Sequence, residues 1–169
     1  MHDYTIGFIG GGNMARSLVG GLIADGLPPA ALLVAEPDPA RRDALAQQFG
    51  VTIAADNREV AARADVVVLA VKPQVMRAVA AGIAAAGRPQ TLYLSIAAGI
   101  RTADLARWLG GTPALVRAMP NTPAMVGSGA TALYANAAVD ERQRGLAENC
   151  LRAVGLVQWL DDEALMDAV

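Results

Sequence analysis

Short apolar runs alternate along the chain with longer segments whose apolar residues recur at helical spacing. The run at 66–70 is the clearest of the short ones, because a continuous apolar run that begins with three β-branched valines is typical of a strand buried on both faces. The predicted strands are 4–9, 31–35, 51–54, 66–70, 91–95, 114–119, 130–134 and 156–160. The predicted helices are 13–24, 39–49, 58–63, 73–86, 102–109 and 140–154.

This alternation of strands and helices with short connections predicts an α/β fold. We expect a doubly wound, mostly parallel sheet with helices on both faces and right-handed crossovers. The chain has 169 residues, which suits one domain with a sizeable core.

Composition narrows the possible functions. Hydrophobic residues make up 54% of the chain and the net charge is −2, which argues against disorder and against nucleic-acid binding. No apolar run approaches the ~20 residues that span a bilayer, and no signal peptide is recognisable, so we expect a cytoplasmic protein. The single cysteine, Cys150, excludes a zinc-thiolate cluster, and the single histidine, His2, is terminal. We therefore expect neither a metal site nor a histidine-based triad.

The strongest local signal lies between the first strand and the first helix. Here Gly10, Gly12 and Ala15 occupy the three small positions of the pattern G-x-G-x-x-G/A. Gly10 permits a tight turn, and Gly12 lets a pyrophosphate approach the backbone at the helix N-terminus. Because the motif follows a strand and opens a helix in an alternating chain, it predicts dinucleotide binding by a Rossmann-type domain. The alternative is an ordinary glycine-rich turn.

An acidic residue, Glu36, directly follows the second predicted strand. A carboxylate there can accept hydrogen bonds from both ribose hydroxyls, which favours NADH, and it repels a 2′-phosphate. Arg41 and Arg42 come a few residues later and could reach such a phosphate, or they could form a solvated first turn of a helix. The choice between NADH and NADPH stays open, with Glu36 favouring NADH.

Three more loops follow predicted strands, at the sheet edge that faces the ligand crevice in such folds. Lys72 could contact phosphate or ribose there, or be a surface lysine. The segment 95–99 has small residues where a nicotinamide or substrate would approach. The segment 119–123 combines two prolines with polar groups, and it could equally be a structural loop.

Several segments, in this order and at these intervals, closely resemble the Δ1-pyrroline-5-carboxylate reductase family. They are 10–14, 70–74, 97–99 and 119–123, with the closing stretches 155–157 and 161–169. The resemblance covers the whole chain. It implies hydride transfer from NADPH or NADH to a small cyclic imine acid, Δ1-pyrroline-5-carboxylate, which gives L-proline in the last step of proline biosynthesis.

The resemblance also implies roles for individual residues. Glu36 would face the adenosine ribose, although family members carry Asn-Arg or Ser at this point to hold a 2′-phosphate. Asn57 would contact the adenine-side ribose or its phosphate. Asn121 and Thr122 would border the hydride-transfer site. The pyrophosphate and the rest of the cofactor would contact Gly10, Gly11, Gly12, Asn13, Met14, Ala70, Val71, Lys72, Pro73, Ala98 and Gly99.

Family members continue beyond the Asp-Ala-Val stretch into a second, all-helical domain. That domain forms the dimer, carries the substrate carboxylate site and supplies a Ser or Thr hydroxyl proposed to act on a proton. We therefore expect residues 1–169 to be an NAD(P)-binding domain with no catalytic residue of its own, and with little or no activity alone. Homo-oligomer formation would need the helical domain, and exposed apolar residues around 160–169 would fit a surface that it covers.

Two other functions stay open. The chain could belong to a related imine or β-hydroxyacid reductase with a similar cofactor domain, although the Met-Pro-Asn-Thr-Pro stretch argues against this. It could also be a non-enzymatic NAD(P)-sensing module, which would bind cofactor but gain no activity when the helical domain is restored.

Overall fold

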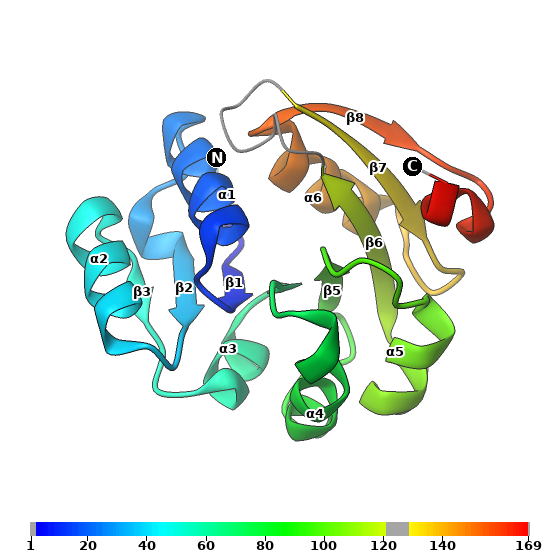
Figure 1. Ribbon diagram of the computed structural model, residues 1–169, viewed down its shortest axis with the longest axis horizontal. Coiled ribbons are helices and arrows are strands. Elements are labelled where there is room, and N and C mark those ends of the chain that lie inside the picture. The colour runs from blue at the N-terminus through cyan, green and yellow to red at the C-terminus, as the bar shows by residue number, and fades with distance from the viewer. Residues whose placement is uncertain (1–2, 121–128, 169) are drawn as a thin grey trace.

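The computed structural model describes residues 3–120 and 129–168, and it contains one eight-stranded sheet within these ranges (Figure 1). The strands are β1 (Ile6–Ile9), β2 (Leu32–Ala35), β3 (Thr52–Ile53), β4 (Val66–Leu69), β5 (Leu92–Ser95), β6 (Ala114–Pro120), β7 (Gly129–Ala135) and β8 (Gly155–Trp159). The α-helices are α1 (Asn13–Ala24), α2 (Pro39–Phe49), α3 (Asn57–Arg63), α4 (Pro73–Ile83), α5 (Thr102–Leu109) and α6 (Glu141–Arg152). Two 3-10 helices are η1 (Pro29–Ala31) and η3 (Glu163–Ala168).

The strand order is β3-β2-β1-β4-β5-β6-β7-β8, and the first six strands in this order are mutually parallel. β7 runs antiparallel to β6, and β8 runs parallel to β7. Only residues 121–128 separate β6 from β7, too few for the crossover that a parallel pair needs. The prediction of a doubly wound, mostly parallel Rossmann-type sheet is confirmed, with a reversal at β7 that strand-helix alternation did not predict.

Two apolar layers cover the two faces of the sheet. β4 shows how they arise, since Val66 and Val68 join one layer while Val67 and Leu69 join the other, and all four are fully buried. The first layer packs residues of α1, α2 and α6 on the sheet, and the second packs residues of α3, α4 and α5. Figure 1 shows α1 and α6 on the opposite side of the sheet from α3, α4 and α5.

Helix boundaries follow local signals closely. α1, α2 and α5 begin and end at the predicted residues. α2 starts at Pro39, whose fixed φ suits the first helical position, and ends before Gly50, which adopts a left-handed φ of 72°. α4 ends at Ile83, three residues before its predicted end, and η3 was not predicted.

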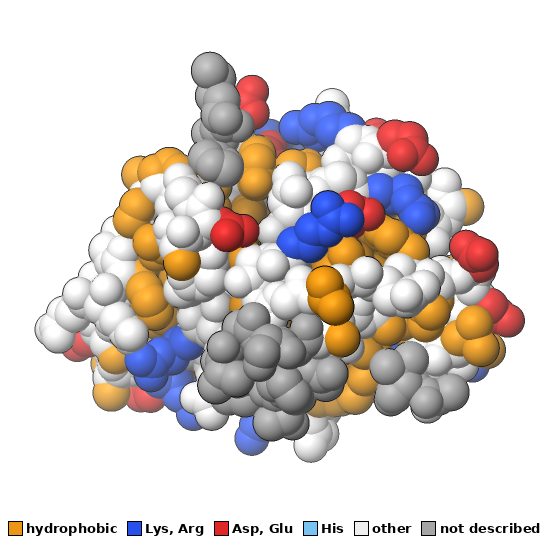
Figure 2. Space-filling model, turned by 90° about the horizontal axis from the view of Figure 1, so that it is seen from above, with side chains coloured by type: hydrophobic (Ala, Val, Ile, Leu, Met, Phe, Trp, Pro, Cys, Tyr) orange, Lys and Arg blue, Asp and Glu red, His pale blue; other side chains and the backbone are white. Residues whose placement is uncertain are grey.

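On the face shown in Figure 2, basic and acidic side chains are interspersed, with no large area of one sign. Among the large apolar residues, Leu156 on β8 is 78% exposed and Leu165 on η3 is 49% exposed. Leu165 fits the expected apolar surface near the end of the chain, whereas its neighbour Met166 is fully buried.

Two negative findings apply to the part of the chain that the structure describes. No helix there has the length and apolarity needed to cross a membrane. No group of three or more metal-ligating side chains gathers there in a way that could hold a metal ion.

Candidate functional site

The loops that follow β1, β2 and β4 meet at one edge of the sheet. The backbone N–H of Gly10 donates to the carbonyl of Ala35 at 2.9 Å, and the N–H of Ala70 donates to the carbonyl of Ile9 at 2.9 Å. Strand order reverses here, because β2 and β4 flank β1 on opposite sides. Open α/β sheets place their ligand crevice at such a switch point.

The three glycines after β1 have different surroundings. Gly10 has a φ of 103°, and a Cβ there would lie 2.5 Å from the carbonyl oxygen of Ala70, so no larger residue fits. A Cβ on Gly11 would lie 2.8 Å from a methyl carbon of Leu45. A Cβ on Gly12 would meet no atom of the described residues within 4 Å. The loop is therefore tightly packed at Gly10 and Gly11 and open at Gly12.

Gly12 is also the N-cap of α1, and within the described part of the chain no side-chain capping bond is made at this helix end. The first turn of α1 contains no acidic residue. Uncapped N–H groups and the positive end of the helix dipole make such a terminus attractive to anions. The open space at Gly12 and the helix terminus therefore fit a phosphate group, as the sequence motif predicts.

The carboxylate of Glu36 lies buried beneath this loop. One oxygen accepts a hydrogen bond from the N–H of Gly11, and the other accepts one from the N–H of Asp38, both at 2.9 Å. The guanidinium of Arg41 lies 3.8 Å from the first oxygen and is itself exposed. The sequence predicted that Glu36 follows the second strand, but it did not predict that the Glu36 carboxylate holds the glycine loop. A carboxylate oxygen can accept more than one hydrogen bond, so a role towards ribose is compatible with these contacts.

The other predicted residues are distributed along the same edge. Val71 lies against Gly10, since a Cβ there would come within 3.4 Å of a Val71 methyl carbon. Lys72 is the exposed N-cap of α4, and Pro73 is the first residue of that helix, as predicted. Ala98 and Gly99 are exposed in the loop after β5. Asn13 and Met14 open α1.

Of the remaining predicted residues, the structure describes Asn57. Asn57 is the first residue of α3 and borders a groove between α3 and α4 that Arg58, Val79 and Ile83 also line. Asn121 and Thr122 lie outside the described residues, as does His2.

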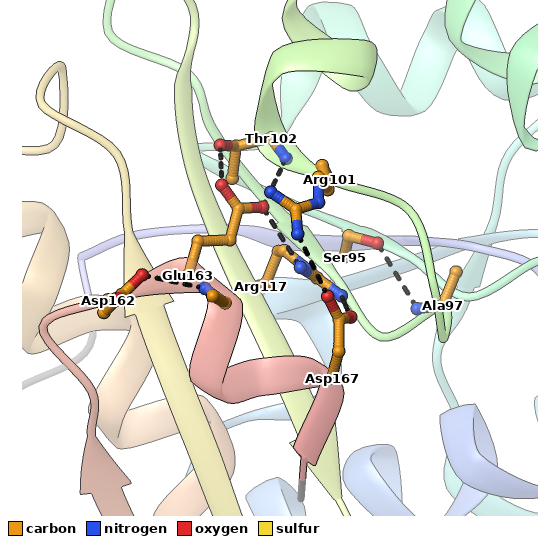
Figure 3. A network of polar contacts seen from close by, with 9 residues as sticks. Ser95, Ala97, Arg101, Thr102, Arg117, Asp162, Glu163 and Asp167 are labelled. Carbon is orange, nitrogen blue, oxygen red and sulfur yellow. Dashed lines mark hydrogen bonds and ion pairs between the residues drawn. The ribbon is translucent and has the colours of Figure 1, made fainter.

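Sequence reasoning missed a polar cluster on the other side of β5, drawn in Figure 3. Arg117 on β6 is 1% exposed, and its guanidinium donates to Glu163 at 3.1 Å and to Asp167 at 3.4 Å. Glu163 also accepts hydrogen bonds from Thr102, and Asp167 pairs with Arg101. The available signal was an arginine inside the otherwise apolar run at 114–119, in a predicted buried strand.

The mostly parallel sheet, with its glycine loop and helix N-terminus at the switch point, defines a Rossmann-type domain. The chain belongs to the family described as NADP oxidoreductase, coenzyme F420-dependent, whose family model matches residues 5–99.

Individual relatives carry a narrower description. The chain is 51% identical over 169 residues to a pyrroline-5-carboxylate reductase of Pseudomonas aeruginosa, covering 100% of this chain and 62% of that protein. A solved pyrroline-5-carboxylate reductase from Coxiella burnetii is 44% identical, with a TM-score of 0.94 over 98% of this chain and 62% of that one. The resemblance predicted from the sequence is thus confirmed, and the chain spans about three fifths of the length of these relatives.

A more distant structure shares the fold. The Plasmodium falciparum pyrroline carboxylate reductase, solved with NADP bound, is 23% identical and has a TM-score of 0.86 over 98% of this chain and 60% of that chain.

Proposed function

We propose that this chain is the cofactor-binding domain of a pyrroline-5-carboxylate reductase. The reaction would transfer a hydride from NADPH or NADH to the C=N bond of Δ1-pyrroline-5-carboxylate and give L-proline. The observation that carries the proposal is the open space at Gly12 on an uncapped helix N-terminus. The 51% identity to a reductase of that name supports the choice of substrate.

Different described residues would contact different parts of the cofactor. The N–H groups at the start of α1 would bind the pyrophosphate, and the lack of a side chain on Gly12 would let it approach. Glu36 would accept hydrogen bonds from the adenosine ribose, with Asn57 on the adenine side. Lys72 would contact phosphate or ribose. Ala98 and Gly99, both exposed, would leave room for the nicotinamide ring.

The bound cofactor supplies the hydride. What the protein must add is the position of the nicotinamide against the imine carbon, and a proton or hydrogen bond at the imine nitrogen. We assign no proton donor to residues 3–120 and 129–168, and Asn121 and Thr122 would border the reacting atoms. In the relatives, about two fifths of the length lies outside the part that this chain matches. We propose that this additional part delivers the proton, binds the substrate carboxylate and makes the homo-oligomer contacts. The chain alone is then expected to turn over little or no substrate. We propose the cytoplasm as the location of the protein.

Titration of this chain with NADH and with NADPH, followed by cofactor fluorescence or calorimetry, tests the proposal. We expect both to bind, with NADH the tighter, because the Glu36 carboxylate repels a 2′-phosphate.

Glu36→Gln keeps an acceptor for the Gly11 N–H and removes the charge. We expect it to shift the affinity ratio towards NADPH by about tenfold.

The matched control is Glu59→Gln, which removes a partly exposed carboxylate on α3 and should leave the ratio unchanged. Absence of binding by both cofactors would contradict the proposed function. A ratio that Glu36→Gln leaves unchanged would contradict only the role of Glu36.

A further inference from the structure

The cluster around Arg117 joins β6 and the start of α5 to η3, which follows them much later in the sequence (Figure 3). We propose that Arg117 is a positioning residue of the cofactor site: through Glu163 and Asp167 it fixes the loop 96–101, which carries Ala98 and Gly99. This inference rests on the proposed function, since it concerns the nicotinamide end of the same site.

Arg117 stands at the centre of the cluster. It lies opposite Ser95, the last residue of β5, in the register of the sheet. Its side chain is 1% exposed and bridges the two carboxylates of η3, with Glu163 at 3.1 Å and Asp167 at 3.4 Å. Because β5 pairs with β6 and Arg117 binds η3, the position of η3 is fixed relative to the last residue of β5.

η3 in turn holds the far end of the loop. The carboxylate of Glu163 accepts hydrogen bonds from both the N–H and the hydroxyl of Thr102, each at 2.7 Å. It thereby caps α5, whose own N-cap residue, Arg101, makes no side-chain capping bond. Asp167 pairs with Arg101 at 3.4 Å. Residues 101 and 102 are thus tied to Arg117 through two separate carboxylates.

The near end of the loop is held by β5. The hydroxyl of Ser95, which is buried, accepts a hydrogen bond from the N–H of Ala97 at 3.3 Å. Between the two ends, Ala98 and Gly99 are exposed, and Gly99 has a φ of 76°. Residues this small have little side chain with which to fix their own backbone by packing, so the residues on either side of them, among them the buried Ile100, determine where they lie.

Stability alone explains this cluster poorly. A buried ion pair adds little net stability compared with well-packed apolar residues of similar size. The Nε atom of Arg117 is buried without a hydrogen-bond partner among the described residues, which raises the desolvation cost of the guanidinium further. The two carboxylates and the two guanidinium groups balance in charge, so the cluster is not a spare anion site. What it provides is a fixed geometry for the loop.

The test compares two ligands of this chain, NADH and ADP-ribose, because ADP-ribose lacks the nicotinamide. In Glu163→Gln we expect NADH affinity to fall by about tenfold, since a displaced loop misplaces the nicotinamide end, while ADP-ribose affinity stays unchanged. The matched control is Asp104→Asn on α5, the helix that Glu163 caps; it removes an exposed carboxylate paired with Arg107 and should affect neither ligand.

A milder pair of variants covers the case in which Glu163→Gln does not fold. Thr102→Val removes the hydroxyl that donates to Glu163 and leaves no charge unpaired, and Thr102→Ser restores it. We expect a selective loss of NADH affinity in the first variant and recovery in the second. Equal losses for NADH and ADP-ribose, or no loss in any folded variant, would overturn the positioning role. Failure of the unaltered chain to bind either ligand would overturn the proposed function and this inference with it.

Discussion

Three adjacent glycines of identical appearance in the sequence carry three different constraints. Gly10 is required by its backbone conformation and by the carbonyl of Ala70, and Gly11 by close packing on Leu45. Gly12 meets neither constraint, because its φ of −75° suits any residue and its surroundings are open. Its requirement for glycine would come from the ligand rather than from the fold.

This difference separates binding from stability. In Gly12→Ala we expect the affinity for NADH to fall at least about tenfold, because a methyl group blocks the approach of the pyrophosphate. The free energy of unfolding should fall by about 1 kcal/mol at most, since only an N-cap preference is lost. Calorimetry and urea unfolding measure the two quantities.

Gly145→Ala on α6 is the control for this experiment, because its new methyl group also meets open space. It should leave NADH binding unchanged and add about 1 kcal/mol of stability through helix propensity. Unaltered NADH affinity in Gly12→Ala would speak against a phosphate at this loop.

Residue-scale prediction from the sequence succeeded where partners are close along the chain. The glycine motif and Glu36 fall within one strand-helix-strand unit, so spacing alone places them together. The partners of Arg117 lie 46 and 50 positions away, and no local pattern connects them. The buried arginine itself was visible in the sequence, but the acidic residues that bind it were not.

At the scale of elements, helices with their own start and stop residues were predicted best. α2 has both Pro39 and Gly50. α4 was predicted too long because Ala84, Ala85 and Ala86 have high helix propensity. The chain instead turns towards β5, and Gly87 then packs against the hydroxyl of Tyr93, where a Cβ would lie 2.0 Å away. Tertiary packing therefore outweighs the helix propensity of these alanines and ends α4 at Ile83. η3 is held by ion pairs with Arg117 on β6, so the residues of η3 alone did not indicate a helix there.

The start of α6 offers a test of such local signals. The carboxylate of Asp140 accepts from the N–H of Gln143 at 2.8 Å, and the Gln143 side chain accepts from the N–H of Asp140 at 3.0 Å. Asp140→Ala should lower the free energy of unfolding by about 1 kcal/mol, because this capping box is lost. Asp38→Ala is the control, since Asp38 is the N-cap of α2 without a side-chain capping bond. Equal effects of the two variants in urea unfolding would show that the capping bonds add nothing.

For the molecule as a whole, the alternation of elements was enough to predict the fold class but not the complete strand order. Parallel strands β1 to β6 follow from the helices between them. The direction of β7 follows from the short connection after β6, and the place of β8 at the sheet edge follows from its pairing with β7. These depend on contacts between strands, which hydrophobic periodicity does not encode.

Global stability should depend on alkaline pH through Cys150. Burial raises the pKa of this thiol to about 12, from 9.0 in an exposed setting. The thiol therefore stays protonated in the folded chain and loses its proton in the unfolded chain once the pH exceeds 9.0, so that stability falls as pH rises. The slope is about 1.4 kcal/mol per pH unit, or about 2 kcal/mol between pH 9 and pH 10.5.

Urea unfolding of this chain and of Cys150→Ala across that pH range measures the effect. The variant should be less stable at neutral pH, because a methyl group replaces the buried thiol, yet it should lose less stability at high pH. Burial also raises the pKa of Tyr93, and this contribution remains in both proteins. Parallel pH profiles would contradict the assignment to Cys150.

The double engagement of Glu36 bears on how this domain could evolve or be redesigned. Under the proposed function, one carboxylate both discriminates against a 2′-phosphate and holds the Gly11 and Asp38 amides in place. Replacing it with a small residue would relieve the repulsion and at the same time release the loop. With a small residue at position 36, tight NADPH binding would therefore need further substitutions that supply a new cation for the phosphate and a new acceptor for the Gly11 amide. A small residue at position 36 on its own would give a protein that binds both cofactors less tightly.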